Sequence, residues 1–310
     1  MHFCTKCKFA EVISGTIPSE PRSRSGVVRN ALAPEGPVWL NEHMTKDLTE
    51  SFTALHQDLL VLPNAWDTAS ARLMVRAGAA AVATSSSAVS WSHGYPDGNR
   101  LPFELALATI ARISRSVGVP VSADIESGYA DDDAGLSANA QAVIDAGAAG
   151  VNLEDSGAAG LLGVDHAAHR IGVVRAAAQA AGVGLFINAR TDVFLAGNPP
   201  QDGVRQVIER SRAYLEAGAS GVFVPGLLDL DKLAEITAAV DAPVNVLAGP
   251  GAPSVAELKA AGVRRISVGN DLAGLAYATA ERAAQQILET GEFTALQGAA
   301  DYGAMQQLFQ

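Results

Sequence analysis

Cysteine is nearly absent from this 310-residue sequence, in which Cys4 and Cys7 are the only examples. Both lie at the extreme N-terminus, which disfavours a secreted fold held together by disulfides. The sequence also lacks any run of about 18 apolar residues, which a membrane-spanning helix would need. Its first residues have no apolar core of the kind that signal peptides carry. We therefore expect a soluble, cytoplasmic protein.

Basic residues are fewer than acidic ones, because the sequence has 22 Lys and Arg but 33 Asp and Glu, which gives a net charge of −11. Acidic surfaces repel nucleic-acid phosphates and anionic lipids, so we expect no nucleic-acid and no membrane partner. Hydrophobic residues make up 48% and charged residues 18%, which allows a large core and excludes a mostly disordered chain. This composition favours a small molecule as the partner.

Residues 1–50 combine both cysteines with several prolines and mixed charge, and they show no apolar period. We interpret them as an N-terminal appendage, either disordered or the result of a start site assigned too early, because Met44 directly precedes the regular part. The Cys4-x-x-Cys7 pair would need two more ligands for a structural zinc site, and we expect no metal there. Residues 51–310 are expected to form the catalytic domain.

From about residue 58 onward the sequence repeats one pattern, in which a helical stretch ends in a small residue plus Gly and a short apolar run follows. Ala146-Gly147 and Ala217-Gly218 are examples, typical of a helix C-terminal glycine that leads into a buried strand. Alternating helices and strands at about 30-residue spacing predict a parallel sheet. The strands are expected near residues 59–63, 79–84, 119–123, 149–154, 184–189, 220–225, 243–247 and 264–268.

Eight such units predict an α/β fold of the (β/α)8 TIM-barrel type, with helices such as 103–117 and 202–217 between the strands. An open, doubly wound sheet is the alternative. That alternative is disfavoured because the fingerprint Gly-x-Gly-x-x-Gly is missing after the first predicted strand.

Polar residues follow five predicted strands at their carboxyl ends, where barrel enzymes build their active sites. One acidic residue at a strand end can simply cap the next helix, but several adjacent ends favour a functional site. The residues concerned are Asn64 to Asp67, Thr84 to Ser87, Asp124 and Glu126, Glu154 and Asp155, and Arg190 to Asp192.

Three carboxylates at neighbouring strand ends, Asp124, Glu126 and Glu154, form the candidate metal site. These strand ends carry no His or Cys that would favour zinc. Hard oxygen ligands suit Mg²⁺, with Mn²⁺ as the alternative. Mg²⁺ keeps several waters, and a 2-oxo-carboxylate can chelate its remaining positions. Arg190 has two open interpretations, which are binding of a substrate carboxylate and an internal ion pair with Asp124 or Glu154.

Two enzyme classes are disfavoured by what the strand ends lack. The only lysines beyond the N-terminal segment, Lys232 and Lys259, lie in helical stretches, so a Schiff-base aldolase would have no nucleophile. The run Ser85-Ser86-Ser87 has no paired histidine, which disfavours serine nucleophile chemistry. Its backbone N–H groups are better candidates for an oxyanion site.

Glycine-rich turns at 249–251 and 269–270 follow the last two predicted strands, where many barrels bind phosphate. Their only basic neighbours are Arg264 and Arg265, so we rank a phosphate site low.

Over about residues 55–290 the sequence resembles the isocitrate lyase and phosphoenolpyruvate mutase superfamily. Six motifs occur in the order found in that superfamily. They are PNAWDTASARL from Pro63, TSSS and GYPDG between Thr84 and Gly98, ADIESGY from Ala123, NLEDS from Asn152, and NARTD from Asn188.

The resemblance implies a barrel whose last helix swaps onto a neighbouring subunit in a dimer of dimers. It implies Mg²⁺-assisted formation or cleavage of a C–C or P–C bond next to an oxo-acid. It also implies site residues, with Asp97, Asp124, Glu126 and Glu154 holding the metal and its waters, and with Trp66, Ser86, Ser87, Arg190 and Asn245 lining the oxo-acid site. Ser85, which begins the same serine run, is a further candidate substrate-binding residue.

The sequence departs from its relatives in the loop after the fourth strand, SGAAGLLGVDHAAHRIG. The loop lacks the Lys-Lys-Cys-Gly-His motif of the isocitrate and methylisocitrate lyases, and also the lysine and asparagine of the phosphonomutases. His166 and His169 are candidates to replace the missing acid, and we favour His166, although surface positions that cap a helix are the other interpretation. Glu126 stands where Asp is more usual, and Pro225 where many relatives place a glutamate.

We therefore expect a Mg²⁺-dependent lyase or decarboxylase acting on a small oxo- or hydroxy-dicarboxylate through an enolpyruvate-like intermediate. Its catalytic residues are expected to be Arg190, Glu154, Asp97 and His166. The alternatives are P–C bond chemistry of the phosphoenolpyruvate mutase or carboxyphosphonoenolpyruvate phosphonomutase type, and a non-catalytic barrel that binds oxo-acids.

A final helix is expected from Asn270 to about Glu289, with apolar residues recurring at helical spacing. This stripe can cover the helix's own barrel, which is the default for a terminal barrel helix. Together with the resemblance, it favours exchange between subunits, and we expect a homo-oligomer, most simply a tetramer. The stripe consists of Leu272, Leu275, Ala276, Thr279, Ala280, Ala283, Ala284, Ile287 and Leu288.

Overall fold

The computed structural model describes residues 42–157, 160–195 and 200–310. The cysteine pair and most of the predicted appendage lie outside the described residues. Within the described residues, no helix is long and apolar enough to cross a membrane.

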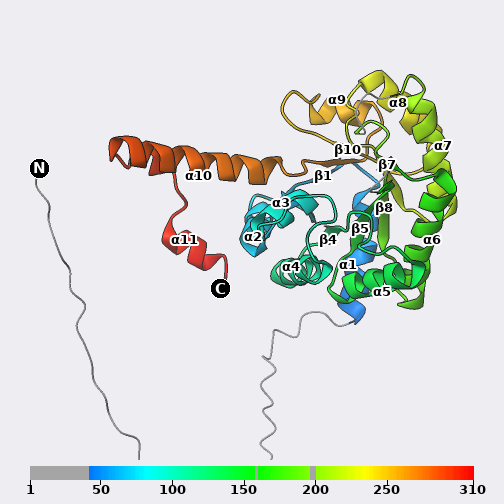
Figure 1. Cartoon of the computed structure of the whole chain (residues 1–310), viewed down its shortest axis with the longest axis horizontal. Helices are drawn as coiled ribbons and strands as arrows, with labels where there is room; N and C mark the ends of the chain where they lie inside the picture. Colours follow the sequence, from blue (N-terminus) through cyan, green and yellow to red (C-terminus); the bar gives the residue numbers. More distant parts are fainter. Residues whose placement is uncertain (1–41, 158–159, 196–199) are drawn as a thin grey trace, which may run out of the picture. The chain divides into compact units, whose positions relative to one another are not determined.

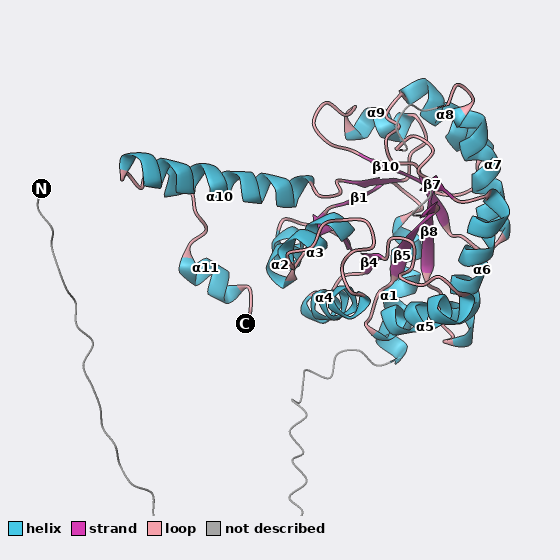
Figure 2. Ribbon diagram, in the orientation of Figure 1, coloured by secondary structure: helices cyan, strands magenta, loops and turns pink. Residues whose placement is uncertain are grey.

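Nine short parallel strands form one sheet that curves into a nearly closed barrel, with helices between them (Figures 1 and 2). The order is β1-β11-β10-β9-β8-β5-β4-β3-β2. The strands are β1 (Leu60–Leu62), β2 (Asn64–Ala65), β3 (Val82–Thr84), β4 (Val121–Asp124), β5 (Gly150–Glu154), β8 (Phe186–Arg190), β9 (Gly221–Phe223), β10 (Val244–Leu247) and β11 (Arg265–Ser267).

The predicted (β/α)8 barrel is confirmed, and each of the eight predicted strands coincides with a strand of the sheet. The first predicted strand is split at Pro63 into two pieces. β1 pairs with β11, and β2 pairs with β3, so this one stretch of chain bridges the last and second strands of the barrel. Proline cannot donate to a strand ladder, and its place between the two pairings leaves both ladders intact.

Helices alternate with the strands as the sequence pattern predicts. Gly147 and Gly218 have φ values of +92° and +104°, as expected for glycines that end a helix in the left-handed region. The helices are α1 (Glu42–Leu55), α2 (Thr68–Arg76), α3 (Ser86–Ser92), α4 (Phe103–Ser116), α5 (Asp133–Asp145), α6 (Val164–Ala180), α7 (Gly203–Glu216), α8 (Leu230–Ala239), α9 (Val255–Ala260), α10 (Asp271–Thr290) and α11 (Tyr302–Gln307), with a 3₁₀ turn at Thr294–Leu296.

Helix α1 crosses the predicted domain boundary at residue 50 and packs against the amino-terminal ends of the strands. Phe52 is fully buried, and its ring meets Phe186 at 5.5 Å in an edge-to-face arrangement. His56, one turn later, stacks on the same Phe186 ring at 4.0 Å. A Cβ on Gly150 would lie 2.7 Å from the Phe52 ring, so the first residue of β5 has to be glycine for this helix to dock. Because α1 occupies that end, the carboxyl ends of the strands form the open mouth.

A small antiparallel hairpin, β6 (Ser156–Gly157) with β7 (Gly160–Leu161), follows β5 at the mouth. Helix α10 follows β11 and has Ala273 as its single buried residue. Figure 1 shows α10 extending beyond the ring of barrel helices. Most of its predicted apolar stripe is therefore exposed in the single chain, while Leu272, Ala283 and Ile287 are partly buried.

Candidate active site

A cavity of about 240 Å³ lies at the carboxyl ends of the strands, and we call it the mouth cavity. It combines two carboxylates, one guanidinium, several amides and hydroxyls, and four apolar side chains. Its lining residues are Asn64, Ser85, Ser86, Ser87, Asp97, Asp124, Asn152, Arg190, Leu195, Phe223, Pro225, Leu247, Ser267, Gly269 and Asn270.

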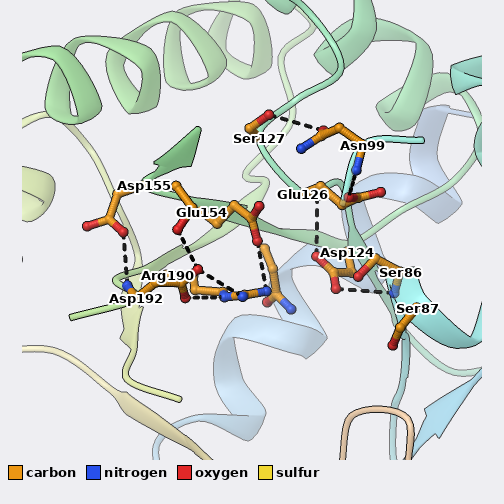
Figure 3. A network of polar contacts seen from close by, with 12 residues as sticks. Ser86, Ser87, Asn99, Asp124, Glu126, Ser127, Glu154, Asp155, Arg190 and Asp192 are labelled. Carbon is orange, nitrogen blue, oxygen red and sulfur yellow. Dashed lines mark hydrogen bonds and ion pairs between the residues drawn. The ribbon is translucent and has the colours of Figure 1, made fainter. Parts of the chain in front are cut away.

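Asp124, at the end of β4, is the carboxylate held most firmly in the mouth cavity (Figure 3). Its Oδ2 accepts a hydrogen bond from the Ser86 backbone N–H at 3.2 Å, and its Oδ1 accepts one from the Glu126 N–H at 3.3 Å. Its own N–H donates to Thr84 Oγ1 at 2.8 Å. The first residue of α3 and the turn after β4 therefore fix the orientation of this carboxylate, and β3 holds its backbone.

Asp97 lies on the segment between α3 and α4 and also lines the mouth cavity. Burial raises the pKa of Asp97, and the neighbouring negative charge of Asp124 raises it further. Two carboxylates facing one cavity, Asp97 and Asp124, form a place where a cation is favourable.

Glu126 lies two residues beyond Asp124 and does not line the mouth cavity. Its Oε1 accepts a hydrogen bond from Tyr129 Oη at 2.5 Å, and its Oε2 accepts one from the Asn99 backbone N–H. Glu126, Asn99 and Tyr129 are the three non-glycine residues with positive φ within the described part of the chain. The backbone is thus strained where two segments meet, as is common beside functional groups. Burial also raises the pKa of Glu126.

Arg190, at the end of β8, pairs with Glu154 of the adjacent β5 at 2.8 Å. Its Nε and Nη2 also donate to the two oxygens of Asp192, at 2.6 and 3.0 Å. The internal ion pair that we considered for Arg190 therefore exists with Glu154. Burial raises the pKa of Glu154 to about 8, against the opposing effect of Arg190. The guanidinium still lines the mouth cavity, so pairing and substrate binding are compatible.

The predicted metal ligands can be compared with what a divalent cation needs. Among the described residues, no group of three His, Cys, Asp or Glu side chains is placed to hold an ion together. Asp97 and Asp124 are the carboxylates open to the mouth cavity, whereas Glu126 and Glu154 are engaged by protein donors. Mg²⁺ is commonly bound by one or two carboxylates and keeps several waters. The residues present fit a hydrated ion that Asp124 and Asp97 would hold.

The predicted substrate residues separate into two groups. Ser85, Ser86 and Ser87 line the mouth cavity, and the Ser85 and Ser87 hydroxyls lie 3.1 Å apart. Asn245 is 1% exposed and lies behind the cavity wall, where it contacts Ser267. Trp66 lines a neighbouring hollow of about 260 Å³, and its ring lies 6.3 Å from that of Tyr277 on α10.

His166 lies in the first turn of α6, is exposed and does not line the mouth cavity. Its predicted role as the replacement acid stays a prediction.

The sequence analysis missed a buried polar network behind Arg190. Asp155 Oδ2 accepts hydrogen bonds from Tyr214 Oη at 2.7 Å and from Arg210 Nη1 at 3.0 Å, both from α7. Its Oδ1 accepts one from the Asp192 backbone N–H at 2.9 Å. Arg210 Nη2 also donates to the Leu162 carbonyl, just beyond β7. The one available signal was the i, i+4 spacing of Arg210 and Tyr214 on a predicted helix.

A second missed residue is Arg265, which was considered only as a weak neighbour for phosphate. Its side chain is 1% exposed and lies inside the barrel, where its Nη2 donates to Ser122 Oγ at 3.1 Å and to Asn152 Oδ1 at 3.2 Å. Asn188 donates to the same Asn152 oxygen at 2.8 Å. Asn152 lines the mouth cavity, so this buried cation lies one residue beneath it.

Comparison with known proteins identifies the family to which this chain belongs. The family model of phosphoenolpyruvate phosphomutase matches residues 52–288, which includes the barrel and its polar mouth. The chain belongs to this family. It is thereby a member of the isocitrate lyase and phosphoenolpyruvate mutase superfamily, whose members include lyases and mutases.

Among curated relatives, an uncharacterized protein of Mycobacterium tuberculosis is 39% identical over 222 residues, covering 71% of this chain and 82% of its own. The 2-methylisocitrate lyase of Halalkalibacterium halodurans is 26% identical, covering 67% of this chain and 70% of its own.

Among solved structures, a protein of Burkholderia cenocepacia provisionally described as a lyase/mutase is 35% identical with a TM-score of 0.81, covering 86% of this chain and 97% of its own. A phosphonopyruvate hydrolase solved with oxalate and Mg²⁺ has the same fold, with a TM-score of 0.74 and 20% identity, covering 84% of this chain and 94% of its own.

Proposed function

We propose that this protein is a Mg²⁺-dependent lyase that cleaves a C–C bond in a small oxo- or hydroxy-dicarboxylate. The single observation that carries this proposal is the mouth cavity, in which Arg190 faces two carboxylates, Asp97 and Asp124. Arg190 provides a fixed anion site, because Glu154 and Asp192 hold its guanidinium from behind. The carboxylates provide the complementary cation site.

The chain's own residues supply most of the chemistry. Arg190 orients the substrate carboxylate and offsets the negative charge that develops on the oxo-acid fragment when the C–C bond breaks. Glu154, with a pKa raised to about 8 by burial, is suited to hold or release a proton near neutral pH. Asp97 and Asp124 would hold Mg²⁺ and its waters. When bound, the ion would supply Lewis acidity to the oxo-acid oxygens.

Replacement of Glu154 with Ala tests this proposal. We expect turnover to fall below detection while the far-ultraviolet circular dichroism spectrum stays that of the wild type, because Asp192 still pairs with Arg190 when Glu154 is removed. Asp165→Ala, on the exposed first turn of α6, is a suitable control and should retain turnover. Undiminished activity of the Glu154→Ala variant would refute the proposed mechanism.

The family match favours P–C bond chemistry as a second candidate, since its model describes a phosphomutase. Phosphonopyruvate incubated with the protein and Mg²⁺ can be followed by ³¹P NMR. A lyase of the kind proposed leaves the phosphonate resonance unchanged, whereas isomerisation or release of phosphate would reverse the order of the two candidates.

A further inference from the structure

Strand β5 places one amide, Asn152, on the floor of the mouth cavity. Successive side chains of a strand point to opposite faces, and Val151 and Leu153 pack outward in the core cluster shared with α5 and α6. Asn152 and Glu154 therefore point into the barrel. Asn152 lies one layer deeper than Glu154, in register with Asp124 on the neighbouring strand. It is 5% exposed and lines the mouth cavity.

The orientation of this amide is fixed by the donors beneath it. Asn152 Oδ1 accepts hydrogen bonds from Arg265 Nη2 at 3.2 Å and from Asn188 Nδ2 at 2.8 Å. A guanidinium has donors only, so the atom of Asn152 that contacts Arg265 has to be the oxygen. No described residue accepts a hydrogen bond from the amide nitrogen of Asn152. Its N–H donors are thus available to a ligand in the mouth cavity.

Arg265, which holds this amide, is a buried cation with no carboxylate partner among the described residues. Its Nε and Nη1 have no hydrogen-bond partner there either, and its guanidinium carbon lies 5.7 Å from the Phe52 ring centroid. Burial lowers the pKa of Arg265 to about 9, and the negative charge of Asp124 opposes this effect. The guanidinium therefore stays charged at neutral pH. Its charge polarises the Asn152 amide and favours an anion in the cavity above it.

We propose that Asn152 is a further ligand-binding residue, whose amide N–H donates to the oxygen of the bound oxo-acid that reaches deepest into the barrel. Arg265 and Asn188 hold the amide oxygen, which leaves the nitrogen for the ligand. This inference deepens the proposed function and rests on it. It specifies a carboxylate or carbonyl oxygen at the deep end of the ligand, because an ammonium or alkyl group there would leave the N–H donors unpaired.

Isothermal titration calorimetry with oxalate, in the presence of Mg²⁺, tests the inference on two variants of the full chain. Asn152→Asp keeps the oxygen that Arg265 and Asn188 contact but replaces the N–H donors with an acceptor. Asn152→Ala removes the donors without adding charge. Because each change removes a hydrogen bond to a charged group, both variants should bind oxalate about tenfold more weakly than the wild type, or weaker still.

Titration with Mg²⁺ alone separates a ligand contact from a structural role. N–H donors do not bind a cation, so Asn152→Ala should keep the wild-type affinity for Mg²⁺ within about twofold and lose affinity for oxalate. If Asn152→Ala fails to fold, Asn152→Asp keeps the test decisive, since it retains both hydrogen bonds that hold the side chain.

Ser114→Ala is the control for loss of a buried polar group. Ser114 is also 5% exposed, but it lies on α4 and is not part of the cavity lining. This variant should bind oxalate as tightly as the wild type does. Urea unfolding of each variant checks that the fold is retained.

Failure of this inference and failure of the proposed function give different results. If the wild type binds oxalate with Mg²⁺ and the Asn152 variants bind it equally well, the oxo-acid site stands and the role of Asn152 is wrong. If Asn152→Ala loses Mg²⁺ and oxalate together, Asn152 supports the structure of the site and the inference is also overturned. If the wild type itself fails to bind oxalate with Mg²⁺, the proposed function is wrong and the inference falls with it.

Discussion

His56 is a titratable side chain that the fold buries without using it in the proposed chemistry. It is 4% exposed, its ring stacks on Phe186, and its Nδ1 lies 2.8 Å from the Phe52 carbonyl oxygen. Burial lowers the pKa of His56 from 6.5 to about 4, and the charge of Arg265 adds to this effect. The folded protein therefore keeps the imidazole neutral at a pH where the unfolded chain binds a proton.

The sign of the resulting pH dependence follows from linkage. Stability is fully present above pH 6.5 and falls as the pH drops from 6.5 to about 4, because only the unfolded state gains the proton. A lowering of this size corresponds to roughly 3 kcal/mol at the acid end. In urea unfolding between pH 7 and pH 4.5, His56→Phe should lose less stability than the wild type. Equal losses in both proteins would show that His56 does not carry this dependence.

At this scale the sequence identifies which residues gather at the mouth, but not how each side chain is oriented. Asp97, Asp124 and Arg190 follow from the strand-end pattern and the resemblance, and all three line the mouth cavity. Glu126 follows from the same pattern, yet its carboxylate is bonded to Tyr129 and Asn99 instead. Its positive φ, which sets that orientation, leaves no signature in a non-glycine residue.

Helix α7 is joined to the mouth by Arg210 and Tyr214, which both contact the buried carboxylate of Asp155. Arg210→Met would leave this charge buried without its cation, which typically costs about 3–5 kcal/mol. Tyr214→Phe removes the hydrogen bond that Tyr214 Oη donates to Asp155, which is worth about 1.5–3 kcal/mol. It also removes the one that Tyr214 Oη accepts from Arg210 Nη1, but that group keeps Asp155 as its partner. Urea unfolding should therefore rank both variants below the wild type, with Arg210→Met the less stable.

Arg205 provides the control on the same helix. It is exposed and pairs with Asp202 and Glu209 at the surface, where such pairs contribute little. Arg205→Met should unfold at nearly the wild-type urea concentration. If Arg210→Met were no less stable than Arg205→Met, the hydrogen-bond network through Asp155 would not contribute to the stability of the fold.

The strands and long helices were predictable from periodicity because buried β-strands and amphipathic helices recur over many residues. The β6–β7 hairpin was not, since its strands of two residues show no period. Helix α1 was missed because it begins within a segment of mixed composition. Its role depends on Phe52 docking over Gly150, a contact between residues 98 positions apart that no local pattern reports.

The C-terminal segment exposes several large apolar residues, and these bear on how whole molecules assemble. Leu275 is 61% exposed, Leu288 85%, Phe293 66% and Tyr302 78%. Large apolar surfaces of this kind commonly mark a protein interface. We propose that α10 packs on a second copy of the chain and that the protein is a homo-oligomer, most simply a tetramer.

Light scattering at micromolar concentration measures this assembly directly. We expect a mass that is a multiple of the 31.9 kDa chain for the wild type. The double variant Leu275→Glu, Leu288→Glu should shift towards the single chain, because buried unpaired carboxylates oppose association. A wild-type mass equal to one chain would refute the assembly.

The central claim is that the mouth cavity binds an oxo-acid together with Mg²⁺, and a crystal structure with oxalate and Mg²⁺ tests it most directly. The account predicts an ion at about 2.1 Å from an Asp124 oxygen, with waters completing its coordination. It also predicts an oxalate carboxylate that chelates the ion and lies within hydrogen-bond distance of Arg190. Oxalate bound away from Arg190, or an ion held at another place in the barrel, would contradict the account.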